Sequence, residues 1–199
     1  HFAVEVPKEK AGKQLLDWTG GYYETNWSVN PTWNARFEKF PDHPIARGVK
    51  PFELVDEWYY HMRFRENMEG VTAILSAVPP DSTREGPDGP YSGNPTVRSR
   101  KGMAEDLAWA RQRPDGGRGF GFTGGHFHYN WANDGFRTIV LNAIVWVAGL
   151  DVPPQGVRSK TPTLEELLAN QDYPQPNDFN RPHVEDILKK WKQEAADSK

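Results

Sequence analysis

The segment RGFGFTGGHFHYNWANDGFRTIVLNAIVWVAG, residues 118–149, decides the fold class because it joins a strand pattern to a helix pattern. Residues 118–123 form the strand part, and Gly124-Gly125 ends it. Asn133-Asp134 then caps a helix that we predict over residues 135–149, since asparagine and aspartate are favoured N-cap residues. The helix carries a wide apolar face, which predicts packing on a sheet. That face consists of Phe136, Ile139, Val140, Ala143, Ile144 and Val147.

The neighbouring sequence extends this pattern in both directions. Residues 107–113 are expected to pair with residues 118–123, because Pro114-Asp115-Gly116-Gly117 supplies the positive φ that a hairpin turn needs. The other predicted elements are strands at 35–40, 54–64 and 71–78, helices at 11–18, 163–170 and 183–195, and an irregular insertion at 81–102. The last two helices lie in an extension that starts after Pro153-Pro154. We therefore predict a layered α/β domain.

The composition of the chain excludes several classes of partner and of chemistry. The 199 residues suffice for one domain, and a net charge of -3 with a pI near 6.1 lacks the basic surface that binds phosphate backbones. We expect no nucleic-acid partner. No run approaches about 18 apolar residues, so we expect a soluble chain that spans no membrane. The absence of cysteine removes thiolate nucleophiles and sulfur-ligated metals. The expected partner is a small polar molecule, and either the cytoplasm or a bacterial periplasm fits the chain.

The strongest signal for chemistry is the loop Gly124-Gly125-His126-Phe127-His128, between a strand and a helix. Ligands of open α/β sheets bind where strands end and turn into helices, so His126 and His128 are candidate acid/base groups. The alternative is a polar turn with hydrogen-bonded histidines. A catalytic zinc site needs about three protein ligands. His1, Glu57 and His61 are the other candidate ligands, but nothing in the sequence shows that they converge, so we predict no metal and no cofactor.

The segment Asp56-Glu57-Trp58-Tyr59-Tyr60-His61 holds the candidate carboxylate. On a strand Glu57, Tyr59 and His61 would share one face, with Glu57 and His61 roughly 13 Å apart. Both could not touch one reacting atom without a bulge. We select Glu57, which lies nearer the loop that enters the strand. In the alternative interpretation, both acids cap the backbone or pair with Arg47 or Arg63.

Residues 22–34 are rich in aromatic residues and asparagine and have no clear period. Binding sites for small ligands combine apolar walls with a few polar groups, so this segment is a candidate sugar platform. It fits a buried core equally well. Its members are Tyr22, Tyr23, Asn26, Trp27, Asn30, Trp33 and Asn34.

These motifs together resemble the ThuA-like (trehalose utilisation) family over roughly residues 1–150. The matching motifs are Asp42-His43-Pro44-Ile45-x-Arg47-Gly48-Val49, Asp56-Glu57-x-Tyr59, Val71 to Leu75, Ala108-Trp109, Gly117-Arg118-Gly119-Phe120, Gly124-Gly125-His126 and Leu141-Asn142-Ala143-Ile144-Val145-Trp146. The resemblance implies a fold similar to class I glutamine amidotransferases. That fold is a flavodoxin-like, three-layer domain with helices on both faces of a mainly parallel sheet. It also implies that the opening βαβ units precede His1.

The resemblance further implies site residues. His1 falls near the position of the amidotransferase cysteine and His126 near that of its catalytic histidine, but without cysteine a thiol glutaminase is excluded. We expect an enzyme of carbohydrate metabolism, acting on trehalose, a related disaccharide or a keto-sugar, with His126, Glu57 and His1 as catalytic groups. The expected substrate-binding residues are His128, His61, Tyr59, Trp131, Trp27 and Asn30. The alternatives are a non-catalytic sugar-binding domain and a metal-dependent hydrolase. The predicted division is a ThuA-like domain at 1–152 and a helical extension at 153–199.

Overall fold

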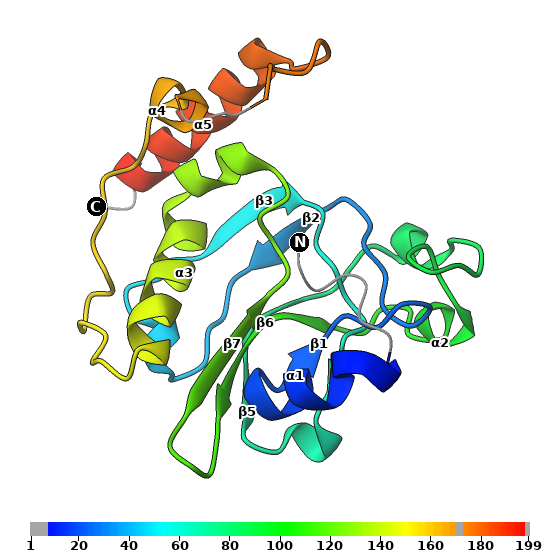
Figure 1. Cartoon of the computed structure of the whole chain (residues 1–199). Coiled ribbons are helices and arrows are strands. Elements are labelled where there is room, and N and C mark those ends of the chain that lie inside the picture. Colours follow the sequence, from blue (N-terminus) through cyan, green and yellow to red (C-terminus); the bar gives the residue numbers. More distant parts are fainter. Residues whose placement is uncertain (1–7, 170–172, 198–199) are drawn as a thin grey trace.

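The computed structural model describes residues 8–169 and 173–197 and shows a mixed α/β fold (Figure 1). The strands are β1 (Gly21–Tyr22), β2 (Trp33–Phe37), β3 (Phe52–Asp56), β4 (Arg63–Phe64), β5 (Val71–Ala77), β6 (Glu105–Gln112) and β7 (Arg118–Phe122). The α-helices are α1 (Lys13–Trp18), α2 (Pro95–Arg98), α3 (Asp134–Val147), α4 (Leu164–Leu168) and α5 (Arg181–Asp197). Short helical turns are η1 (Lys8–Gly12), η2 (Pro44–Ala46), η3 (Glu66–Met68), η4 (Asp81–Arg84) and η5 (His128–Ala132).

All strand pairs within the described residues are antiparallel. The largest sheet has the order β5-β6-β7, and two smaller sheets pair β2 with β3 and β1 with β4. The expected mixture of helices and strands is confirmed, but the mainly parallel sheet is not found in this part of the chain. Parallel neighbours need a crossover of a dozen or more residues, usually a helix, whereas β6 returns to β7 through the short turn 113–117.

The hairpin β6–β7 forms as its turn sequence predicts. Asp115 Oδ1 accepts the backbone N–H of Gly117 at 2.9 Å, and Gly116 has a φ of +85°, which glycine adopts without strain. The register pairs Gln112 with Arg118 and Ala108 with Phe122. The hairpin therefore ends with Phe122 beside the buried middle of β6, and the chain leaves the sheet at Thr123.

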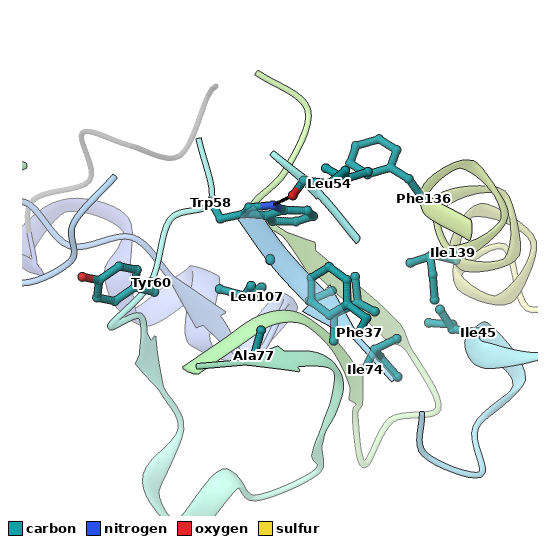
Figure 2. Packing of buried hydrophobic residues seen from close by; sticks show 14 of the residues in the cluster. Phe37, Ile45, Leu54, Trp58, Tyr60, Ile74, Ala77, Leu107, Phe136 and Ile139 are labelled. Atoms are coloured by element: carbon teal, nitrogen blue, oxygen red, sulfur yellow. Dashed lines mark hydrogen bonds between the residues drawn. The ribbon is translucent and has the colours of Figure 1, made fainter. Parts of the chain in front are cut away.

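Helix α3 packs across this sheet and completes the core. Asn133 caps it by accepting the N–H of Phe136 at 3.1 Å, as the sequence predicts. Phe136 and Ile139 are fully buried and point toward Trp58, Phe37 and Ile45 (Figure 2). The predicted apolar face is partly wrong, because Ile144 is 61% exposed and Val147 is 42% exposed. Trp146 and Asn142 are buried instead, so the buried face is rotated toward them.

The predicted strand 54–64 is wrong at residues 57–62, which separate β3 from β4. Strand β3 ends at Asp56, and residues 57–62 follow an irregular path whose one β-bridge, between Tyr60 and Val29, lies outside the named strands. His61 has a φ of +57°, which is incompatible with a strand. The aromatic residues that suggest a strand are instead core residues of a loop, since Trp58 and Tyr60 are fully buried.

The insertion 81–102 is held to the sheet by a buried ion pair. Arg84, which has no exposed surface, donates to Glu105 Oε1 at 2.8 Å, and Arg100 reaches the same oxygen at 2.9 Å. Tyr60 donates to the carbonyl of Thr83 at 2.9 Å. The insertion therefore lies against the loop 57–62, although it contains only η4 and the single turn of α2.

The two C-terminal helices lie at one end of the molecule, near η5 and α3 (Figure 1). A capping box begins α4, with Thr163 and Glu166 in reciprocal hydrogen bonds, as the sequence predicts. Arg181 of α5 pairs with Glu165 of α4 at 2.5 Å. Val184 is buried, and Trp191 packs against the main core. Over the residues that are described, no helix combines the length and the apolar character needed to cross a membrane.

Candidate functional site

The site begins at the end of β3, where Asp56 organises the loop that follows β7. Asp56 is fully buried and accepts the successive backbone N–H groups of Gly125, His126 and Phe127 at 2.7, 3.0 and 3.2 Å. It also accepts Nδ2 of Asn130 at 3.0 Å and the N–H of Glu57 at 2.8 Å. A buried carboxylate surrounded by such donors fixes the path of the backbone. Asp56 therefore sets where His126 lies relative to Glu57.

Gly125 gives this loop its shape. Its φ is +107°, a conformation that other L-residues rarely adopt, although a Cβ there would meet no atom within 4 Å. The glycine is thus required by backbone conformation rather than by space. Gly124 is different, because a Cβ there would come within 2.6 Å of the Trp58 ring. Gly125 therefore allows the backbone to turn toward Asp56, and Gly124 allows it to lie close to the Trp58 ring.

Glu57 and His126 meet at this point. Nδ1 of His126 lies 3.0 Å from Oε2 of Glu57. The Glu57 carboxylate is held from two sides, by the Tyr59 hydroxyl at 2.9 Å on Oε2 and by Asn30 Nδ2 at 3.3 Å on Oε1. The His126 side chain is 44% exposed and that of Glu57 is 20% exposed. The pair is thus anchored on the protein side and reachable from solvent.

This geometry assigns different tasks to the two imidazole nitrogens. With Nδ1–H donated to Glu57, the lone pair of neutral His126 resides on Nε2, which becomes the proton acceptor. The carboxylate also stabilises the imidazolium that forms when Nε2 takes a proton. Burial, and then the hydrogen bond to Glu57, raise the pKa of Tyr59, so its hydroxyl stays a donor at neutral pH. An imidazole held in this way can act as a general base, with the carboxylate orienting it.

A cavity of about 290 Å³ adjoins the pair. Glu57 and His126 are not among its lining residues, but they are linked to the lining through Tyr59, which donates to Glu57, and through Gly124 and Gly125, which precede His126. Apart from these, its lining residues include Tyr22 and Tyr23 from the aromatic segment that the sequence singles out. Trp33 of the same segment is instead buried in the core, where its Nε1 donates to the carbonyl of Trp58 at 2.9 Å.

Other candidate residues lie outside the Glu57–His126 contact. His61 is buried and stacks on Trp27, with ring centroids 4.4 Å apart, and its Nε2 lies 3.2 Å from Thr96 Oγ1. The guanidinium carbon of Arg63 lies over the Trp27 ring, 3.4 Å from its centroid. Burial lowers the pKa of His61 to about 4, so this imidazole is neutral at neutral pH.

The remaining candidates take three different positions. Trp131 packs edge-on against Phe136 and joins the core. His128 is exposed on η5. His1 lies outside the described residues. The alternative pairing of Glu57 or Asp56 with an arginine is wrong, because Arg63 pairs with Glu24 at 2.8 Å and Arg47 donates to the carbonyl of Val152 at 2.5 Å.

The sequence interpretation missed the anchoring role of Asp56. Asp56 does cap backbone N–H groups, as the alternative interpretation predicts, but the sequence does not indicate that these groups lie in a segment 69 to 71 residues further along the chain. The one signal for Asp56 in the sequence is its place in the motif Asp56-Glu57-x-Tyr59, directly before the candidate carboxylate. In residues 8–169 and 173–197, no group of three or more histidine, cysteine, aspartate or glutamate side chains is arranged to hold a metal ion.

These features define the class of protein. It is a mixed α/β protein in which the segments that follow β3 and β7, two strands of different sheets, bring a carboxylate and an imidazole together near an aromatic cavity. The ThuA family model, described as trehalose utilisation, matches residues 3–147, and the chain belongs to this family. Family membership suggests a role in trehalose utilisation. No curated protein and no solved structure matches the chain.

Proposed function

We propose that the protein catalyses proton transfer on a sugar that carries a carbonyl group, with His126 as the base and Glu57 as its orienting carboxylate. The observation that supports this most directly is the 3.0 Å contact between His126 Nδ1 and Glu57 Oε2, on a loop fixed by Asp56. The proposed substrate is a keto derivative of trehalose or of a related disaccharide, in which one ring hydroxyl is already oxidised, because the chain belongs to the trehalose utilisation family.

The reaction follows from the two groups. Nε2 of His126 removes a proton from the carbon next to the carbonyl, which leaves an enediolate, and the imidazolium returns the proton to the enediolate. Both steps conserve atoms and charge and need no further reactant. Histidine suits this role because its ordinary pKa lies near neutrality.

Glycoside hydrolysis is less well supported. Glycosidases use two carboxyl groups that flank the bond to be broken. The carboxylate next to Glu57 in the chain is Asp56, which is fully buried and occupied by N–H donors from the loop 125–127. Asp56 cannot protonate a leaving group from that position. One accessible carboxylate with one imidazole favours proton transfer.

Exchange with heavy water tests the proposal. The protein is incubated in D2O with a keto derivative of trehalose and with D-fructose, and loss of the C–H signal beside the carbonyl is followed by NMR. We expect exchange with the parent and a decrease of about 100-fold or more for His126→Ala, the usual size of a general-base contribution. Parent-like exchange by His126→Ala would contradict the assignment.

The non-catalytic alternative rests on the aromatic cavity, which suits sugar binding whether or not turnover follows. Saturable sugar binding without exchange or cleavage would favour it. The metal-dependent hydrolase alternative predicts activity that a chelator removes and a divalent cation restores. Measuring both effects on the same preparation separates the three functions.

The proposal extends to the fold of a longer chain. Three layers with helices on both faces of a mainly parallel sheet, as in class I glutamine amidotransferases, remain our prediction for a version that carries βαβ units before His1. The described strands supply only antiparallel pairs. Parallel strands beside the present sheet in the structure of such a version would support this prediction, and their absence would overturn it.

A further inference from the structure

The cavity beside the catalytic pair has walls of a distinct kind. Most of its large side chains are aromatic, and Leu15 and Met62 complete the apolar lining; the aromatic residues are Tyr22, Tyr23, Tyr59, Trp109, Phe120 and Phe122. Flat aromatic faces pack against the C–H face of a sugar ring, and hydroxyl groups at the edges bind the ring hydroxyls. The cavity supplies both, since Thr19 and Thr123 also line it.

These walls are held in place by contacts with one another and with the surrounding chain. The Tyr22 hydroxyl donates to Glu24 Oε2 at 2.6 Å, and Trp109 Nε1 donates to the carbonyl of Thr19 at 2.8 Å. Tyr23 meets Tyr59 edge to face at 5.6 Å. A site whose side chains are already fixed loses little entropy when a ligand binds.

Gly121 makes room for one wall. A Cβ at this position would come within 2.1 Å of the Trp109 ring, so only glycine lets the indole lie against β7. Trp109 stands opposite Gly121 in the β6–β7 register. A large aromatic residue facing a glycine thus forms part of the cavity.

Thr123 offers the cavity a buried polar atom. The residue is 7% exposed, and its Oγ1 has no hydrogen-bond partner within residues 8–169 and 173–197. A buried hydroxyl without a partner costs free energy, about 1–3 kcal/mol by the usual measure. Its backbone is satisfied, since the N–H donates to the carbonyl of Leu107 at 2.9 Å. The hydroxyl therefore has its hydrogen-bonding capacity available to a ligand in the cavity that Thr123 lines.

We propose that the cavity is the subsite for one sugar ring of the substrate, with Thr123 Oγ1 bonded to a ring hydroxyl as a specificity-determining contact. A volume of about 290 Å³ is at the lower end of small-ligand pockets, which suits one ring and leaves the second ring of a disaccharide outside. The inference rests on the proposed function for the nature of the ligand. Two lining residues connect the cavity to the pair, because Tyr59 donates to Glu57 at 2.9 Å and Gly125 directly precedes His126.

Replacing Thr123 by valine tests this contact. Valine keeps the shape and removes only the hydroxyl, so the variant should fold with an unchanged or slightly higher melting temperature, because no protein hydrogen bond is lost. Calorimetric titration with D-glucose and with trehalose should show about three- to tenfold weaker binding of both sugars, the value of one hydrogen bond. Thr123→Ser should retain parent affinity. The control is Thr72→Val, the same change at an exposed position of β5, which should change neither value.

A bulky substitution gives a second, independent measurement. Leu15 of α1 lines the cavity, and Leu15→Trp should fill part of it and weaken both sugars further than Thr123→Val does. Unchanged affinity in Leu15→Trp, unchanged affinity in Thr123→Val, or a markedly lower melting temperature of Thr123→Val would each overturn the subsite.

Measuring sugar binding and deuterium exchange on the same preparations distinguishes a failure of the subsite from a failure of the proposed reaction. Parent-like sugar affinity in Thr123→Val together with lost exchange in His126→Ala would overturn the subsite and leave the reaction standing. Weakened sugar binding in Thr123→Val with no exchange by the parent would support the subsite and contradict the reaction.

Discussion

Asp56 and Glu57 are neighbours in the chain with opposite environments. Asp56 is fully buried and accepts only N–H donors, whereas Glu57 keeps one face toward solvent and holds His126. The alternation of a strand end sends the first carboxylate inward and the second toward the loop. Asp56 therefore fixes the loop, and Glu57 is left to contact the imidazole that we propose as the base.

Changing Asp56 to asparagine should disrupt the loop 125–127. One carboxylate oxygen would become an NH2 group facing N–H donors from Gly125 and Asn130, or from Glu57, His126 and Phe127. We expect unfolding by urea to show a loss of about 2–4 kcal/mol, since buried donors lose their acceptor. Exchange activity should fall through kcat more than through KM, because His126 is displaced.

Asp151→Asn is the matched control, because Asp151 is exposed after α3. This variant should keep parent stability and activity. An Asp56→Asn protein with both properties unchanged would show that the loop does not depend on the carboxylate.

His61 should make stability depend on pH. Burial lowers its pKa in the folded protein to about 4, whereas the unfolded chain has a histidine pKa near 6.5. Between these values the unfolded state binds more protons, so stability is fully present above about pH 6.5 and falls toward pH 4, by up to about 3 kcal/mol. His61→Asn, which tolerates the positive φ, should flatten this part of the stability curve while lowering its plateau.

Thermal melts from pH 4 to pH 7.5 measure the effect of His61. The pKa of His43 is also lowered by burial, and that contribution remains in both proteins. An identical slope in the parent and in His61→Asn would refute the assignment to His61.

At the scale of elements, α3 joins parts of the chain that sequence distance separates. Asn142 is fully buried in α3, and its Nδ2 donates to the carbonyls of Ile45 and Arg47 at 2.9 Å each. Its Oδ1 accepts the N–H of Val157 at 2.8 Å. One side chain therefore fastens the turn η2 and the start of the C-terminal extension to the helix.

Replacing Asn142 by alanine should cost about 2–4 kcal/mol of unfolding free energy, because three backbone groups lose their partner inside the protein. Urea denaturation followed by tryptophan fluorescence provides the measurement. Asn34→Ala, at an exposed position of β2, should change stability by less than about 0.5 kcal/mol. Equal midpoints for the two variants would contradict the role of Asn142.

Elements with local signals are predictable from the sequence, and those shaped by distant packing are not. The hairpin β6–β7 and the caps at Asn133 and Thr163 follow from a few adjacent residues. Residues 57–62 do not, because Trp58 and Tyr60 are buried by contacts from the rest of the chain. In the same way, the sequence predicts Glu57 and His126 as candidates, but not the Asp56 contacts that bring them together.

At the scale of the whole molecule, the C-terminal extension contacts the same helices and turns that carry the site. Helix α4 packs on η5, which directly follows the His126 loop, and Leu164, Leu167 and Val184 are buried. The division into a domain at 1–152 and an extension at 153–199 stays a prediction. These contacts suggest that the extension contributes to stability more than to chemistry.

A chain that ends after Pro162 should test that division. Loss of α4 and α5 exposes apolar surface, and we expect the free energy of unfolding to fall by about 3 kcal/mol or more. Exchange activity should persist below the lowered melting temperature, because Asp56, Glu57 and His126 remain. A chain that ends at Trp191 keeps α4 and the part of α5 that carries the buried Val184, so it should match the parent. A truncated chain that stays fully folded and loses exchange would reverse this interpretation.

The central claim is that Glu57 and His126 act as one unit on a sugar, and a double-mutant cycle tests it most directly. Deuterium exchange into the keto derivative of trehalose is measured for the parent, Glu57→Gln, His126→Ala and the double variant. If Glu57 acts only through the imidazole, the double variant should be no slower than His126→Ala alone. His126→Ala should also unfold within about 1 kcal/mol of the parent, because the pair is partly exposed. Losses that multiply in the double variant, or a folded His126→Ala that exchanges at the parent rate, would contradict the account.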